Sequence, residues 1–84
     1  MPVPNALCDH LLKKLNLRHD QELANYFDVH PPMISKVRNL TKEVSANFIL
    51  LIHEKTGIPI AEIKDLINLA KRQKHENKKR DEYE

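Results

Sequence analysis

Hydrophobic residues recur through the first 70 positions at spacings of three and four, and no run alternates over the length of a strand. Such spacing places them on one face of a helix, so the chain is predicted to be all-α. Short connections of two to five residues predict a compact bundle of about five short helices. The expected helices are Asn5 to Leu15, Asp20 to Phe27, Pro31 to Asn39, one capped by Thr41 or Ser45 and ended by Gly57, and one opened by Pro59.

The same spacing predicts which residues form the core. Asp20 is expected to be the N-cap of the second helix, ahead of the core side chains. Leu66 and Leu69 lie beside the apolar stripe of the last helix, where they either widen the core-facing surface or form a dimer seam. The predicted inward positions are Leu7, Cys8, Leu11, Leu12, Leu15, Leu23, Ala24, Phe27, Ile34, Val37, Val44, Phe48, Leu51, Ile52, Ile60, Ile63, Ile67 and Ala70.

A length of 84 residues suits one domain, which we place at residues 1–70. Residues 71–84 contain one apolar side chain, Tyr83, and form a charged extension that either continues the last helix or is disordered. The longest apolar run, Phe48 to Ile52, is far shorter than the ~20 residues that a membrane helix needs. The first residues lack the pattern of a secretory signal, so a cytoplasmic location is expected.

Candidate catalytic and metal-binding patterns are weak. The chain has one cysteine, Cys8, and contains neither a Cys-x-x-Cys nor a His-x-x-x-His pair. It also lacks a carboxylate pair, a glycine-rich phosphate loop and a nucleophile triad. We therefore expect no metal, no cofactor and no enzymatic activity.

The second and third helices are separated only by about Asp28 to His30, which favours the sharp crossing of a helix-turn-helix. Residues 21–39, QELANYFDVHPPMISKVRN, resemble this motif in the lambda-repressor-like, Cro/C1-type (XRE family) DNA-binding proteins. Leu23-Ala24 matches the Leu-Ala pair of that family, and Ile34-Ser35-Lys36 matches its Ile-Ser-Arg/Lys run. Asp28 stands where the family usually has glycine, at a turn position that tends to require positive φ.

The resemblance implies a lambda-repressor-like fold over about residues 5–70, with the recognition helix at 31–39 in the major groove. It implies base contacts from Lys36, Ser35, Pro31 and Pro32. Because the prolines cannot donate hydrogen bonds, they would read DNA by shape or by apolar contact with a thymine methyl group. The phosphate contacts that it implies are Gln21, His30, Arg38, Asn39, Thr41 and Lys42.

Charge distribution points to the same segment. From Val29 to Lys42 there are three basic residues and no acidic one, although the chain as a whole carries only +2. Three cations per subunit, doubled in a dimer, predict that log affinity falls with log salt with a slope of roughly five.

These features predict a sequence-specific DNA-binding transcriptional regulator, a small prokaryotic or phage repressor that binds double-stranded DNA as a homodimer and is associated with the nucleoid. The alternative belongs to another class. It is a protein-interaction module, such as an antitoxin-like or adaptor protein, that uses the same fold to hold a protein partner.

Overall fold

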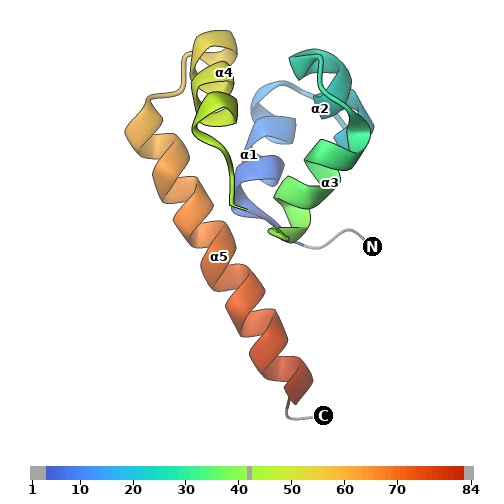
Figure 1. Ribbon diagram of the computed structural model, residues 1–84, viewed down its shortest axis with the longest axis vertical. Helices are drawn as coiled ribbons and strands as arrows, with labels where there is room; N and C mark the ends of the chain where they lie inside the picture. Colours follow the sequence, from blue (N-terminus) through green and yellow to red (C-terminus); the bar gives the residue numbers. More distant parts are fainter. Residues whose placement is uncertain (1–3, 42, 83–84) are drawn as a thin grey trace.

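The computed structural model describes residues 4–41 and 43–82, with side chains through His75. The described chain contains five helices and no strand, which confirms the all-α prediction (Figure 1). α1 lies between the pair formed by α2 and α3 and the pair formed by α4 and α5 (Figure 1). The helices are α1 (Ala6–Lys14), α2 (Asp20–Phe27), α3 (Pro31–Asn39), α4 (Ala46–Thr56) and α5 (Ile60–Glu82).

Capping residues set the limits of α1 and α4. Asn5 caps α1, because its side chain accepts a hydrogen bond from the Cys8 backbone N–H at 2.9 Å. Ser45 caps α4 in the same way by accepting from the Phe48 N–H at 3.2 Å. Of the two caps considered for this helix, Ser45 is therefore the one used, and Thr41 is not. Gly57 ends α4 at φ 76°, as predicted.

The beginning of α2 differs from the prediction. His19 occupies the N-cap position and its side chain makes no capping hydrogen bond, whereas Asp20 is the first helical residue. The predicted Asp20 cap is therefore wrong. The physical reason is a competing partner, because the Asp20 carboxylate is bound by the guanidinium of Arg38 on α3.

The last helix is long, at 23 residues, and it continues through the charged extension to Glu82 (Figure 1). Of the two expectations for residues 71–84, helix continuation is correct for 71–82, and residues 83–84 lie outside the described part. The predicted domain limit at residue 70 falls inside α5. Three side chains beyond it contact the bundle, since Gln73 accepts from the Ala6 N–H at 2.8 Å, Lys74 donates to the Leu40 carbonyl at 2.9 Å, and Lys71 pairs with Glu43.

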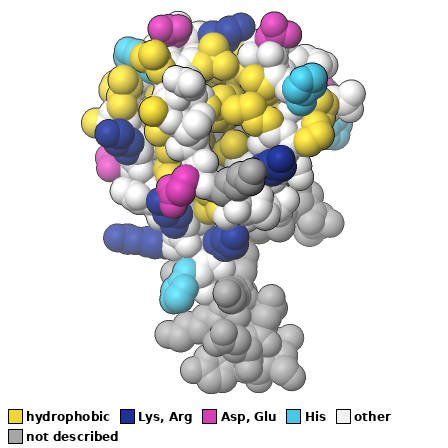
Figure 2. Space-filling model, in the orientation of Figure 1, with side chains coloured by type: hydrophobic (Ala, Val, Ile, Leu, Met, Phe, Trp, Pro, Cys, Tyr) yellow, Lys and Arg dark blue, Asp and Glu magenta, His cyan; other side chains and the backbone are white. Residues whose placement is uncertain are grey.

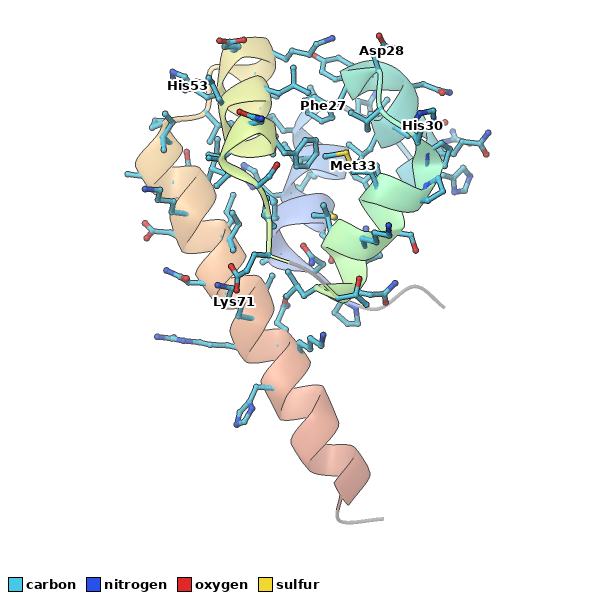
Figure 3. All side chains as sticks on the ribbon, in the orientation of Figure 1. Phe27, Asp28, His30, Met33, His53 and Lys71 are labelled. Carbon is cyan, nitrogen blue, oxygen red and sulfur yellow. The ribbon has the colours of Figure 1, made fainter. Side chains whose placement is uncertain are left out.

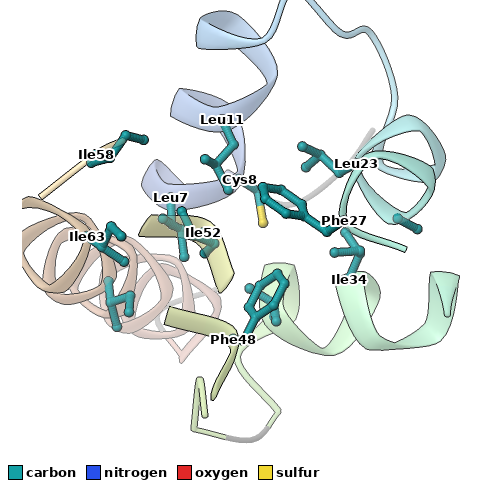
Figure 4. Packing of buried hydrophobic residues seen from close by; sticks show 13 residues of the cluster. Leu7, Cys8, Leu11, Leu23, Phe27, Ile34, Phe48, Ile52, Ile58 and Ile63 are labelled. Atoms are coloured by element: carbon teal, nitrogen blue, oxygen red, sulfur yellow. The ribbon is translucent and has the colours of Figure 1, made fainter. Parts of the chain in front are cut away.

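The core forms where the apolar faces of all five helices meet (Figure 4). Phe27 and Phe48 stack edge to face with ring centroids 5.7 Å apart, which joins α2 to α4. Most predicted core positions are buried or packed against this cluster. Ile60 is the exception, with 37% of its surface exposed, and Ile58 in the preceding loop is buried in its place.

Candidate functional site

The link between α2 and α3 is a tight turn built on a left-handed residue. The C-cap of α2 is Asp28, which has φ 55° and ψ 48°, so the predicted positive φ is confirmed. Val29 then donates its N–H to the Ala24 carbonyl at 2.9 Å, which closes the end of α2. His30 follows at the N-cap of α3 without a side-chain capping bond, and Pro31 and Pro32 occupy the first turn. Three residues thus redirect the chain from one helix into the next (Figure 3).

Arg38, near the end of α3, is buried rather than facing outward. Its guanidinium binds both oxygens of Asp20 in a bidentate pair and lies 3.0 Å from Asp9 Oδ1. Burial by itself lowers the pKa of Arg38, but the hydrogen bonds that it donates to Asp20 and then to Asp9 outweigh burial and hold the pKa above its ordinary value. Arg38 therefore ties α3 to the starts of α1 and α2.

This arrangement changes the interpretation of Arg38 from the sequence. The Arg38 side chain is 6% exposed and its charge is neutralised by two carboxylates, so it has little surface to offer to a phosphate. We therefore remove Arg38 from the predicted phosphate contacts. The pattern along the chain could not show this, because both carboxylates come from other helices.

Asn5 is a second connection between α1 and α3. Its side-chain amide donates to the carbonyls of Val37 and Arg38 at 3.0 and 2.9 Å, while its oxygen caps α1. Asn5 is 1% exposed, so these bonds are shielded from water. Sequence reasoning missed this role, since its only signal was a capping residue before a helix.

The outward face of α3 carries the predicted base contacts. Pro31, Pro32, Ser35 and Lys36 are all exposed and lie on this one helix. Among the side chains that the structure describes, none forms an ion pair with Lys36. Asn39, half-buried, donates its amide to the Ser35 carbonyl at 2.9 Å.

The remaining predicted phosphate contacts are spread around this face. Gln21, His30 and Thr41 are exposed, and Lys42 lies outside the described residues. The pair between Asp20 and Arg38 brings the start of α2 against the end of α3, so Gln21 and Asn39 follow neighbouring ion-paired residues. These assignments stay predictions.

An apolar hollow of about 150 Å³ lies between α3 and α4. Its walls are Met33 and Val37 from α3, Val44 from the segment before α4 and Phe48 from the first turn of α4, with Lys36, Glu43 and Ser45 completing the lining. Figure 3 shows Met33 between the two helices, and Figure 2 shows hydrophobic side chains gathered on this face. The sequence singled out Val37, Val44 and Phe48 only as core.

Cys8 is not a reactive site. It is buried in the core, and burial raises the pKa of its thiol to about 12, with Asp20 and Asp9 adding to the rise and Arg38 opposing it. The thiolate that nucleophilic chemistry requires is therefore scarce near neutral pH. Within the described residues, no group of three or more His, Cys, Asp or Glu side chains could hold a metal ion.

No family model, curated protein or solved structure matches this chain. Among the helices of the described part, none is both long and apolar enough to cross a bilayer. The candidate site therefore depends on its own geometry.

Proposed function

We propose that this protein is a sequence-specific DNA-binding transcriptional regulator in which α2 and α3 form a helix-turn-helix and α3 enters the major groove. The observation that carries the proposal is the unit of α2, the left-handed Asp28 turn and α3, with Lys36 and Ser35 on the exposed side of α3. A helix presented in this way fits the major groove, where a lysine can donate to guanine O6 and N7.

The buried contacts of α3 support this proposal. A recognition helix must hold its register against the bases, and Asn5 and Arg38 fix the end of α3 to two other helices through five polar contacts. Without Arg38, two of the three cations that the sequence has from Val29 to Lys42 are left in each subunit. Four such cations in a dimer, at about 0.9 each, give an expected salt slope of roughly 3.6.

The proposal extends to a repressor that acts as a homodimer, because two copies of α3 would read two half-sites. In such a dimer Leu69, which is 47% exposed on α5, is the candidate for the seam.

The test uses a charge reversal at Lys36. Duplexes retained from a random pool by the full chain are sequenced, and affinity for the enriched duplex is measured for Lys36→Glu and for Lys64→Glu. Lys64 is equally a surface lysine but lies on α5, so it is a matched control for net charge. We expect Lys36→Glu to lose at least tenfold in affinity and Lys64→Glu to stay within about twofold, since a bidentate base contact is worth roughly 1–3 kcal/mol.

Unchanged helical circular dichroism in both variants shows that folding is not the cause. Retained affinity of Lys36→Glu at moderate salt, or failure to enrich any duplex, contradicts the proposal. Arg38→Glu is unsuitable for this test, because it would leave three carboxylates together in place of the ion pair.

A protein-interaction module is the second candidate function, and the apolar hollow beside α3 favours it. This alternative predicts that a stoichiometric protein partner co-purifies with the chain and remains bound to Lys36→Glu.

A further inference from the structure

We infer that the hollow between α3 and α4 is a specificity site that takes the 5-methyl group of a thymine in the major groove. This inference rests on the proposed DNA-binding function and names the chemistry that one part of the site would read. We infer which group the hollow binds from the residues on the exposed side of α3.

Hydrogen-bond donors are few on that side. Pro31 and Pro32 carry no N–H group, and the amide of Asn39 donates to the Ser35 carbonyl at 2.9 Å and more weakly to Ser35 Oγ at 3.5 Å. The exposed residues of α3 that can donate hydrogen bonds to base edges are therefore Ser35 and Lys36. A helix with so few donors can distinguish bases further only by apolar contact or by shape.

The first turn and flank of α3 supply such apolar contact. The two exposed prolines precede Met33, which is half-buried and forms one wall of the hollow. Val44, in the segment before α4, and Phe48, in the first turn of α4, close the opposite side. The thymine methyl is the apolar group that the major groove presents among donors and acceptors, so it is the part of duplex DNA that this hollow suits.

The rim of the hollow agrees with a DNA occupant. Lys36 belongs both to the lining and to the outward face, so a base pair held by Lys36 would lie next to the hollow. Glu43, the acidic residue of the lining, has its charge offset by Lys71, whose Nζ lies 3.2 Å from Glu43 Oε2. The hollow therefore does not present an unopposed negative charge to the DNA backbone.

The experiment removes the methyl group alone. In the enriched duplex, each thymine is replaced in turn by deoxyuridine, and affinity is measured for the unaltered chain, for Met33→Ala and for Leu50→Ala. We expect one thymine in each half-site at which loss of the methyl weakens binding by about fourfold, the worth of one buried CH₂-sized group. For Met33→Ala, the affinity should change by less than twofold on that replacement, because this variant lacks one wall of the hollow.

Leu50→Ala is the matched control, since Leu50 is an exposed hydrophobic residue on α4 that does not line the hollow. It should keep the fourfold dependence. Val44→Ala serves as a second wall variant if Met33→Ala loses helical circular dichroism.

Equal binding of every deoxyuridine duplex by the unaltered chain overturns the inference while the DNA-binding proposal stands. Full methyl dependence in both Met33→Ala and Val44→Ala overturns it too. If no duplex is enriched and an apolar peptide from a protein partner protects Met33 instead, both proposals fall and the hollow is a protein-binding site.

Discussion

Asp28 and Cys8 each lie in conditions that are unfavourable for them, and each is stabilised by its neighbours. Asp28 holds a left-handed conformation that glycine would adopt without strain, and the Val29 N–H closes the turn behind it. Cys8 is the other, a thiol 1% exposed among helices and within reach of the charges of Arg38, Asp20 and Asp9. The consequence for Cys8 can be measured as a pH dependence of stability.

In the folded protein the pKa of Cys8 is about 12, against an ordinary value of 9.0 that applies after unfolding. Above pH 9 the unfolded chain releases the proton and the folded chain retains it, so rising pH favours unfolding. The stabilisation is complete below pH 9 and is lost between pH 9 and pH 12, at up to about 1.4 kcal/mol for each pH unit.

Urea denaturation of the natural chain and of Cys8→Ala at pH 8, 9, 10 and 10.5 tests this prediction. Other groups titrate in both proteins, so the informative quantity is the difference in their free energies of unfolding. It should be constant up to pH 9 and then shrink as the pH rises. A constant difference through pH 10.5 would show that the Cys8 pKa is not raised.

At the scale of the helices, Arg38 connects three elements that the chain separates widely. Replacing it with methionine keeps much of its length but removes the hydrogen bonds to Asp9 and Asp20. The Asp9 and Asp20 side chains are 54% and 30% exposed, so water can partly replace the lost guanidinium. We therefore expect Arg38→Met to lower the free energy of unfolding by about 2–3 kcal/mol, below the 3–5 of a fully buried broken pair.

Lys36→Met is the control, a basic residue two positions away that is exposed on the same helix. It should change stability by no more than about 0.5 kcal/mol. Equal unfolding midpoints for the two variants in urea would show that the ion pairs of Arg38 contribute nothing net.

The contrast between Lys36 and Arg38 shows how far the sequence could predict this protein. Periodicity identified the five helices, because the spacing of apolar residues is a local property of each helix. It placed Phe27, Ile34 and Phe48 in the core for the same reason. Arg38 looked like a surface cation because its carboxylate partners lie on α1 and α2.

The other differences between the prediction and the structure also arise because the sequence pattern does not show contacts between separate segments. Aspartate is a common N-cap residue, but the carboxylate of Asp20 pairs with Arg38 on another helix and does not cap α2. Ile60 continues the apolar stripe of α5 by spacing, yet it is 37% exposed, and it is Ile58 of the preceding loop that is buried in the core. The hollow beside Met33 was not visible for the same reason, since its two walls come from different helices.

At the scale of the whole molecule, α5 raises the question of where the folded unit ends. Composition changes at residue 71, yet the next turn of α5 is part of the bundle through three side chains. Gln73 accepts from the N–H of Ala6 at the start of α1, Lys74 donates to the carbonyl of Leu40 after α3, and Lys71 pairs with Glu43. The first two satisfy backbone groups that a helix end leaves without an intrahelical partner.

Two shortened chains locate the limit of the folded unit. A chain of residues 1–75 keeps all three contacts, so its free energy of unfolding should lie within about 0.5 kcal/mol of the full chain. A chain of residues 1–70 loses them and should be less stable by about 1–3 kcal/mol, since two hydrogen bonds contribute roughly 0.5–1.5 each and the exposed ion pair contributes little. Urea denaturation monitored by circular dichroism measures both.

Gln73→Ala in the full chain should reproduce part of the loss, because it leaves the Ala6 N–H unpaired. Equal stability of the two shortened chains would place the end of the folded unit at residue 70, where the composition changes. The contacts of α5 beyond residue 70 would then contribute nothing to the free energy of unfolding.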